Sequence, residues 1–294
     1  MIPNDDIMFT DDTIILDDTI VSDDIMFADD TIIPDDIIIP DDTMFVDDTI
    51  IPDDTIIPPN TTIPNNTMIP KNIFQTHKSI SYIKTKPKLI HAVNSWKKYK
   101  NDFNYYFYND NDCNAFMKRY FFGKVYNAYK KLPMSVMKAD LWRYCIIYHY
   151  GGIYADVDTI CINSPNIFIN DSLLCIAPEN SHHLCQWIFS APPKSPILKY
   201  IIDLSTERIL NIHEIKGEHI IHFLTGPGVF TDGIENYLKK NNKITFEDKK
   251  KYFRYPDSIL RVFNHEIFHE KIVKHLFTGM DNDGWYHERF RKLM

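Results

Sequence analysis

Two aspartates spaced two residues apart, Asp156 and Asp158, form the pattern in this sequence that is best suited to chemistry. They end an apolar run, Ile153–Asp158, which we expect to be a buried β-strand, and residues two apart on a strand point to the same side. Two carboxylates that converge at a strand end supply the oxygen ligands of a hard divalent cation, Mg²⁺ or Mn²⁺. Such an ion keeps open positions for a diphosphate and neutralises the charge that develops on it as it leaves.

A second charged pair precedes these aspartates, on a predicted helix over residues 135–150. Asp140 and Arg143 are three residues apart on this helix, so their side chains share one face. The pair Gly151-Gly152 ends the helix and lets the backbone turn back sharply, which brings that face beside the proposed cation. Arg143 is then placed to form fork-like hydrogen bonds to sugar hydroxyls or phosphate, with Asp140 holding it in position.

The elements that must position these residues alternate between strand and helix patterns. Ile73–His77 and Tyr105–Tyr108 are predicted strands, and Cys113–Tyr120 and Lys124–Lys131 are predicted helices. This order predicts an α/β domain with a largely parallel sheet. Ligands of such sheets bind beyond the carboxyl ends of the strands, where Asp156 and Asp158 are expected to lie.

The stretch from Lys138 to Asp158 resembles the core signature of the DXD-containing sugar transferases of glycosyltransferase family 32, which includes mannosyltransferases and is related to the large clostridial glucosylating toxins. The resemblance covers roughly residues 69–290. Three further segments carry it: Ile69–His77 is similar to the family's opening strand, His91–Trp96 with Asn109–Cys113 to its "NSW…DD-C" region, and Thr225–Thr231 to its "TGP…T" turn.

The resemblance implies a GT-A fold, a requirement for Mn²⁺ or Mg²⁺, and transfer of a hexose from a UDP- or GDP-sugar with retention at the anomeric carbon. The acceptor hydroxyl would belong to a glycan, a protein or a lipid. No enzymic nucleophile is evident, so a same-face substitution is the more economical mechanism. In that mechanism the metal and Arg143 stabilise the departing diphosphate.

The resemblance also assigns roles to individual residues. Asp158 would be the firmest metal ligand, and Asp156 would contact the donor ribose, the metal or both. Asp140 and Arg143 would hold the donor sugar. The remaining donor contacts would be made by Tyr154 near the nucleotide or diphosphate, by Gln75, Thr76 and His77 around the base, and by Trp285 as a lid. Trp285 departs from the family pattern, because four residues are inserted before it and a serine is missing.

Three alternatives to a glycosyltransferase follow from other patterns. His265-Glu266-Ile-Phe-His269 satisfies the H-E-x-x-H pattern of zinc metallopeptidases, with His275 at the place of a third ligand. That form needs glycine at position 272, where this sequence has Ile272, so the pattern favours surface histidines. The D-x-D-x-T pattern beginning at Asp156 fits haloacid-dehalogenase-type phosphatases, but their first strand carries it. A degenerate, non-catalytic structural protein with the repeat as its working part is the third alternative.

The N-terminal region is a repeat of a different composition. Residues 1–72 divide into twelve hexapeptides, most with two apolar residues and an Asp-Asp pair; this region has a net charge of −17 and the remainder +9. We interpret residues 1–68 as an acidic arm, extended or solenoid-like, and residues 69–294 as the catalytic domain. An extended, solvated arm is favoured; stacked strands would need cations such as Ca²⁺ between the carboxylates.

The remaining composition limits compartment and partners. Five cysteines without C-x-x-C spacing predict reduced, buried thiols, and no apolar run is long enough to span a membrane. With no signal peptide pattern, we expect a cytoplasmic protein and no nucleic-acid partner. The Asn-, Ile-, Lys- and Tyr-rich composition is typical of an AT-rich genome such as that of a large DNA virus, in which case the location would be host cytoplasm or virion.

Overall fold

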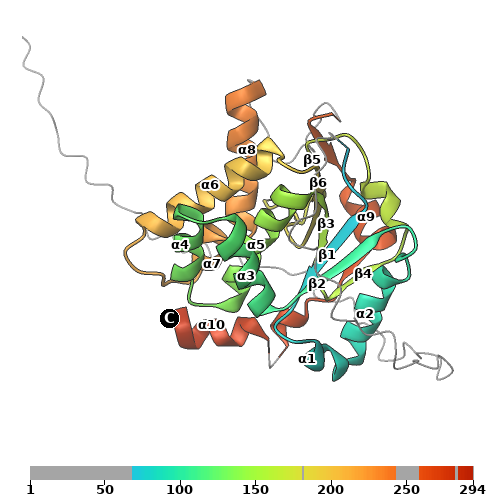
Figure 1. Ribbon diagram of the computed structural model, residues 1–294, viewed down its shortest axis with the longest axis horizontal. Helices are drawn as coiled ribbons and strands as arrows, with labels where there is room; N and C mark the ends of the chain where they lie inside the picture. The colour runs from blue at the N-terminus through green and yellow to red at the C-terminus, as the bar shows by residue number, and fades with distance from the viewer. Residues whose placement is uncertain (1–67, 181, 243–257, 282–283, 294) are drawn as a thin grey trace, which may run out of the picture. The chain divides into compact units, whose positions relative to one another are not determined.

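The computed structural model describes residues 68–180, 182–242, 258–281 and 284–293 (Figure 1). The arm proposed for residues 1–68 therefore lies almost entirely outside the described residues, and its interpretation stays a prediction. The described chain is built on a six-stranded sheet and a small two-stranded one. The strands are β1 (Asn72–Thr76), β2 (Asn104–Tyr108), β3 (Gly152–Ala155), β4 (Thr159–Cys161), β5 (Leu174–Ile176), β6 (Ile188–Ala191), β7 (Leu260–Val262) and β8 (Val273–His275).

The six-stranded sheet has the order β2-β1-β3-β6-β5-β7. β1 is parallel to both β2 and β3, and β5 is parallel to β7. β6 is antiparallel to its two neighbours, so five strands run in one direction and β6 alone is reversed. The α/β fold with a largely parallel sheet is thus confirmed. The carboxyl ends of β1, β3, β5 and β7 lie at one edge, where ligands of such sheets bind.

Helices cover both faces of this sheet (Figure 1). Residues that alternate along the strands feed two separate cores: Phe74 and Tyr154 face one, whereas Ile73 and Ile153 face the other. The strands are therefore apolar on both sides, as parallel strands between helices must be. The helices are α1 (Ile80–Lys84), α2 (Pro87–Lys97), α3 (Asp110–Tyr120), α4 (Lys124–Lys131), α5 (Ser135–Tyr150), α6 (Pro196–Asn211), α7 (Ile220–Leu224), α8 (Pro227–Asn242), α9 (His265–Lys271) and α10 (Trp285–Leu293).

Helix α5 is the central helix and is buried around most of its circumference. It ends at Gly151, whose N–H donates to the carbonyl of Ile147 at 2.8 Å. Gly151 and Gly152 have φ angles of +67° and +120°, and a Cβ on Gly152 would lie 2.6 Å from the backbone oxygen of Asn72. Only glycine suits both the conformation and the close approach, so this pair turns the chain from α5 directly into β3.

Strand β3 is shorter than predicted, since it ends at Ala155 and not at Asp158. Asp156 and Asp158 lie in a turn between β3 and β4, in which the amide of Thr159 donates to the carbonyl of Asp156 at 3.1 Å. Strand alternation therefore does not set the directions of the two carboxylates, and the strand prediction was wrong at this point. The turn sets them instead.

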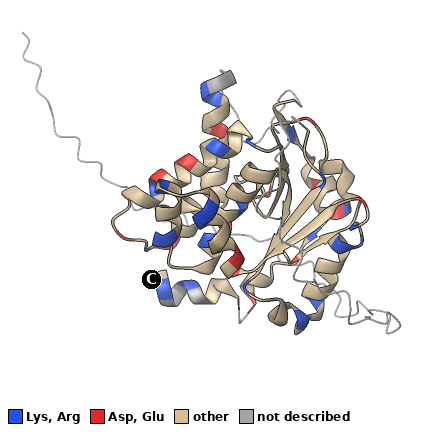
Figure 2. Cartoon of the chain, viewed as in Figure 1, with Lys and Arg blue, Asp and Glu red and all other residues tan. Residues whose placement is uncertain are grey.

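The surface and the thiols agree with the composition. Lys and Arg occur on α2, α4, α8 and α10 and are spread over several elements (Figure 2). All five cysteines are buried and free, as expected. Within the described ranges, every helix is too short or too polar to cross a bilayer. The cytoplasmic location stays a prediction.

Candidate active site

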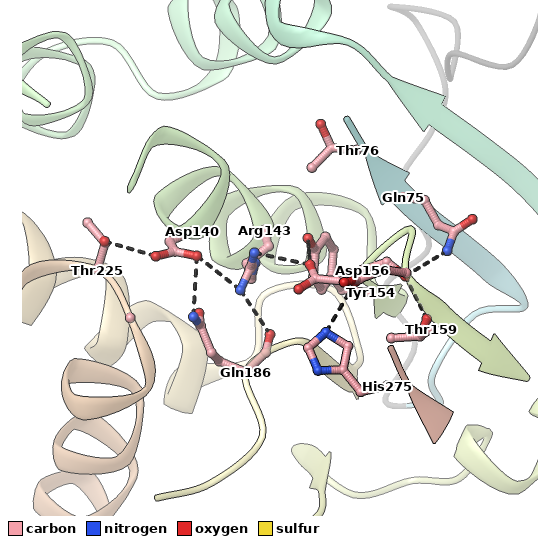
Figure 3. Close-up of polar contacts among 12 residues, drawn as sticks. Gln75, Thr76, Asp140, Arg143, Tyr154, Asp156, Thr159, Gln186, Thr225 and His275 are labelled. Carbon is pink, nitrogen blue, oxygen red and sulfur yellow. Dashed lines mark hydrogen bonds and ion pairs between the residues drawn. The ribbon is translucent and has the colours of Figure 1, made fainter. Parts of the chain in front are cut away.

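Arg143 lies at the centre of a buried ion-pair network beside the carboxyl ends of the strands (Figure 3). Its Nη1 is 3.0 Å from Asp140 Oδ1 and its Nη2 is 3.1 Å from Asp156 Oδ1. The guanidinium also lies over the ring of Tyr154, 4.7 Å from its centroid. The side chains of Arg143 and Asp140 are only 5% and 2% exposed, so these charges depend on one another for compensation.

Asp140 has both carboxyl oxygens engaged within the protein. Oδ1 accepts from Arg143 and, at 3.3 Å, from Gln186 Nε2, while Oδ2 accepts from the hydroxyl of Thr225 at 3.0 Å. Burial raises the pKa of Asp140 to about 6, although the charge of Arg143 opposes this. Asp140 therefore serves mainly to hold Arg143, and it has little freedom to attack or bind a sugar on its own.

Asp156 connects this network to the turn that follows β3. Its Oδ1 accepts from Arg143 and from the hydroxyl of Tyr154. Its backbone carbonyl accepts from Gln75 Nε2 at 3.0 Å and from Thr159 Oγ1 at 2.6 Å. The side chain is 24% exposed, and none of the described residues donates to Oδ2. One carboxyl oxygen of a rigidly held aspartate therefore remains available to a ligand.

Asp158 is held by the C-terminal part of the chain. Strand β4 pairs with β8, which places Thr159 opposite His275. As a result His275 Nε2 lies 3.2 Å from Asp158 Oδ1. Oδ2 accepts from the amide and the hydroxyl of Thr278 at 2.9 and 3.0 Å. Burial alone would raise the pKa of Asp158, but His275 and Thr278 lower it to about 2.

Asp156, Asp158 and His275 form a candidate metal site. One ligand atom from each lies within 4.8 Å of the others, and within the described ranges this is the single group of three or more such residues that could hold an ion. His275 Nδ1 is buried without a hydrogen-bond partner. Two carboxylates with one imidazole suit Mn²⁺ better than Mg²⁺, which prefers oxygen ligands alone.

Two of the residues predicted to border the base, Gln75 and Thr76, have buried side chains, and their contact with a donor stays a prediction. Gln75 is fully buried; it accepts from the hydroxyl of Tyr105 at 2.6 Å and donates to the carbonyl of Asp156. Thr76 donates its hydroxyl to the carbonyl of Tyr108 at 2.7 Å. The Gln75 side chain therefore holds the Asp156–Asp158 turn, and the Thr76 side chain joins the end of β1 to the end of β2.

His77 is the member of this group nearest to open space. It is half-buried and stacks on Tyr82 with ring centroids 5.0 Å apart. Burial lowers its pKa, so the ring is mainly neutral near pH 7. The next residues along the chain, Lys78 and Ser79, line a cavity of about 450 Å³ together with Asn109 and its neighbours at the carboxyl ends of β1 and β2.

Trp285 begins α10 and is half-buried. Its indole packs against Gly279, where an added Cβ would lie 2.3 Å from Trp285 Nε1. Gly279 directly follows Thr278, which binds Asp158. Trp285 therefore lies beside the segment that holds the metal site, and its contact with a donor stays a prediction.

The histidines of the H-E-x-x-H pattern do not gather around a metal. His265 and His269 lie on α9 with ring centroids 4.5 Å apart, but their Nε2 atoms lie 3.1 Å from the carbonyls of Glu179 and Pro178. His275 lies on β8 and contacts Asp158. The part of the chain that the structure describes thus gives the zinc-peptidase interpretation no ligand set.

Sequence reasoning missed several of these contacts. The H-E-x-x-H pattern offers His275 as a zinc ligand, but no sequence pattern predicts that His275 and Thr278 contact Asp158. Gln186 and Glu179 lie in the connection between β5 and β6, where no pattern marks them.

Comparisons with known proteins find a family match for part of this chain. Residues 86–174 match the family described as "Glycosyltransferase sugar-binding region containing DXD motif". The match covers the stretch that holds Asp140, Arg143, Asp156 and Asp158, so the resemblance predicted from these residues is confirmed.

Particular relatives are also similar to it. The chain is 27% identical over 219 residues to an "Initiation-specific alpha-1,6-mannosyltransferase" of Candida albicans, covering 62% of this chain and 57% of the relative. It is 27% identical over 147 residues to the "Uncharacterized glycosyltransferase L373" of Acanthamoeba polyphaga mimivirus, covering 48% and 56%. A solved structure, "PaToxG Glycosyltransferase", aligns with a TM-score of 0.45 and 17% identity over 60% of this chain and 73% of that one. The chain thus spans less than two thirds of the length of these two sequence relatives.

Proposed function

We propose that this protein transfers a hexose from a UDP- or GDP-sugar to a hydroxyl acceptor, with a divalent cation and with retention of anomeric configuration. The observation that supports this most is the position of Asp156. Its Oδ1 belongs to the buried Arg143 network, and the residue is also a member of the group formed with Asp158 and His275. A guanidinium and a candidate metal site thereby lie on one carboxylate, and both are groups that bind diphosphates.

Asp156, Asp158 and His275 would hold the cation, for which we propose Mn²⁺ over Mg²⁺. When bound, the ion would neutralise charge on the leaving nucleoside diphosphate. The proton on His275 Nε2 faces Asp158 Oδ1 in the absence of an ion. Although burial opposes it, the charge of Asp158 raises the pKa of His275 and favours the protonated ring. A metal binds only the neutral imidazole, so coordination would displace a proton from the protonated ring, and metal affinity should rise with pH.

Arg143 would bind the donor diphosphate or sugar hydroxyls, held in orientation by Asp140 and by the ring of Tyr154. Because both oxygens of Asp140 are already engaged, this residue is a poor nucleophile. A same-face substitution, in which the acceptor hydroxyl replaces the diphosphate on the side from which it leaves, accounts for retention without a covalent intermediate.

The nucleotide base would enter the cavity beside His77, at the ends of β1 and β2. The name of the Candida relative makes mannose the first sugar to test, carried on GDP or UDP. The acceptor would be a hydroxyl of a glycan, a protein or a lipid.

A thermal-shift panel of GDP-mannose, UDP-glucose and UDP-galactose, each with and without Mn²⁺, tests the proposal. A donor at 100 times its Kd stabilises the folded state by about 2.7 kcal/mol. We expect one donor to raise the melting temperature with Mn²⁺ only, and Asp158→Asn to abolish that increase. If no donor raises the melting temperature in the presence of Mn²⁺, the proposal is wrong.

A further inference from the structure

One carboxyl group near the candidate site has no role in the network described above. Glu179 follows β5 by three residues, at the same edge of the sheet as Asp156, because β5 and β3 run in the same direction. The side chain is half-buried, and no described residue donates a hydrogen bond to its carboxyl oxygens. Partial burial of a carboxylate without donors costs stability. The Glu179 carboxylate therefore does not stabilise the fold, which indicates another role for it.

The carboxyl of Glu179 is within electrostatic reach of the candidate site. Burial raises the pKa of Glu179 to about 6; the charge of His275 opposes this rise, that of Asp156 adds to it and that of Arg143 opposes it. Burial lowers the pKa of His275, but the charge and hydrogen bond of Asp158 raise it overall, and the charge of Glu179 adds to that rise. The charge of Glu179 thus interacts with His275 and Asp156 of the candidate metal site and with Arg143.

The loop that carries Glu179 is fixed by the two histidines of the H-E-x-x-H pattern. His265 Nε2 lies 3.1 Å from the carbonyl of Glu179, and His269 Nε2 lies 3.1 Å from the carbonyl of Pro178. A carbonyl only accepts, so both Nε2 atoms carry the hydrogen. The amide of Glu179 donates to the carbonyl of His183 at 2.9 Å, which closes the loop. Successive backbone groups of the loop that carries Glu179 are thereby held in place.

The same helix also supports the metal side of the site. The ring of His269 lies 5.7 Å from that of Trp187, and Trp187 stacks on His275 at 4.7 Å with an interplanar angle of 4°. His275 contacts Asp158. Helix α9 therefore sets the position of the Glu179 loop relative to His275 and Asp158. This gives His265 and His269 a structural role that does not involve zinc.

We propose that Glu179 binds the acceptor substrate through hydrogen bonds from its hydroxyls, and that His265 and His269 are positioning residues for its loop. The inference rests on the proposed glycosyl transfer. Strand β5 lies two places beyond β3, on the side away from β1 and the cavity assigned to the base. With the nucleotide proposed at β1 and the diphosphate at β3, the edge at β5 that carries Glu179 is the part of the sheet edge left for the acceptor.

In the transfer, the bond between the anomeric carbon and the diphosphate oxygen breaks and a bond to the acceptor oxygen forms. The hydroxyl proton leaves with the diphosphate. Glu179 neither gains nor loses a proton in this step; it accepts hydrogen bonds that orient the acceptor.

The test compares wild-type protein with Glu179→Gln, using the nucleotide sugar that stabilises the wild type with Mn²⁺. Two acceptors are measured: water, as donor hydrolysis, and the methyl hexoside that the wild type uses best from a panel. We expect the KM for the methyl hexoside to rise by about tenfold or more, because a charged hydrogen-bond acceptor is lost. Hydrolysis and the KM for the donor should stay within about twofold, and the melting temperature should not fall.

The histidines supply the second arm of the test. His265→Leu should raise the acceptor KM in the same direction, and His265→Gln, which keeps a donor N–H, should partly restore it. His91→Leu, the same change at an exposed position of α2, is the matched control and should change neither constant.

Two outcomes would overturn the inference, and a third would separate it from the proposed function. A parallel loss of hydrolysis and transfer in Glu179→Gln would place the carboxyl on the donor side, as a nucleophile or a donor ligand. Unchanged kinetics would remove its role altogether. If the wild type is inert toward every donor, the proposed function itself fails. In that case the melting temperature of Glu179→Gln is compared with that of the wild type. A lower value would show that the carboxyl has a structural role, and a higher value would support a carboxyl without partners that serves to bind a ligand.

Discussion

At the scale of single residues, the site depends on charges that are buried together. Arg143 compensates two carboxylates, and its own side chain is only 5% exposed. Pairs of this kind contribute little net stability against an apolar replacement, but removal of one partner leaves an uncompensated buried charge. The same contacts that orient Arg143 toward a ligand therefore also make the fold sensitive to its loss.

Replacement of Arg143 by alanine should destabilise the protein by about 3–5 kcal/mol, because Asp140 is left buried and unpaired. Urea denaturation measures this free energy of unfolding. The control is Lys199→Ala, which deletes a cation from an ion pair whose side chains are 51% and 57% exposed, and which should cost at most about 1 kcal/mol. The double variant Asp140→Ala/Arg143→Ala should be less destabilised than the sum of the single variants. Additive effects would contradict the pairing.

A separate prediction concerns the candidate metal site of Asp156, Asp158 and His275. Asp158→Asn keeps the size of the side chain but removes the charge that pairs with His275, so Mn²⁺ affinity should fall by about tenfold or more. The electron paramagnetic resonance signal of free Mn²⁺ measures binding directly and needs no substrate. Asp203→Asn, at an exposed position of α6, is the matched control and should bind as the wild type does. Equal Mn²⁺ affinity of Asp158→Asn and wild type would remove Asp158 from the site.

At the scale of elements, short segments that are far apart in the sequence meet. Strand β8 pairs with β4 across a sequence separation of more than 100 residues, and this pairing places His275 and Thr278 on Asp158. Local patterns indicate strands and helices well: Lys124–Lys131 was predicted with the bounds that α4 has. Such patterns do not report three-residue strands, because a stretch as short as Val273–His275 carries no period.

Helix α5 carries a histidine whose surroundings exclude its charged form. His149 packs among Phe116, Tyr120 and Tyr150, with the ring of Tyr120 at 4.2 Å. Burial, followed by the charge of Lys194, lowers the pKa of His149 to about 4 from a model-peptide value of 6.5. Between these values the unfolded chain binds a proton that the folded chain does not, so stability falls as pH falls from about 6.5 to about 4.

His149→Phe should remove this part of the acid sensitivity. The slope of unfolding free energy against pH between 4 and 6.5 should decrease by at most about 1.4 kcal/mol per pH unit, the limit for one proton. Urea denaturation at several pH values measures the slope for the wild type and the variant. His91→Phe, at an exposed position of α2, should keep the wild-type slope. An unchanged slope in His149→Phe would contradict the low pKa.

Gly279 tests whether α10 and its leading tryptophan contribute to donor binding. Alanine at this position would place a methyl group 2.3 Å from Trp285 Nε1, so the indole must move. If Trp285 covers the donor as predicted, Gly279→Ala should raise the KM of the donor several-fold with a small effect on melting temperature. Lys199→Ala, at an exposed position of α6, is the control and should leave the donor KM unchanged. An unchanged donor KM would leave Trp285 without a role in binding.

At the scale of the whole molecule, periodic sequence patterns predict the secondary structure and the fold class, but they do not predict contacts between segments that are far apart in the chain. The α/β class, the helix with Asp140 and Arg143 on one face, and the chain reversal at Gly151-Gly152 follow from spacing and backbone freedom. The burial of Gln75 beneath the Asp156 turn does not, because an isolated glutamine after a strand is equally compatible with a ligand contact. Its surroundings are contributed by Tyr105 on β2.

The body should fold and bind its donor without the acidic arm. Ile69 is 2% exposed, and its amide donates to the carbonyl of Asn170 at 3.0 Å, so a chain that begins at residue 68 keeps this contact and both cores. We expect residues 68–294 to melt within about 2 °C of the full chain, since a change below 1 kcal/mol shifts a domain of this size by only a few degrees. The donor shift with Mn²⁺ should also be equal. Ca²⁺ is the informative addition: stabilisation of the full chain alone by Ca²⁺ would favour stacked, cation-binding repeats over an extended arm, whereas loss of donor binding on truncation would show that the arm belongs to the site.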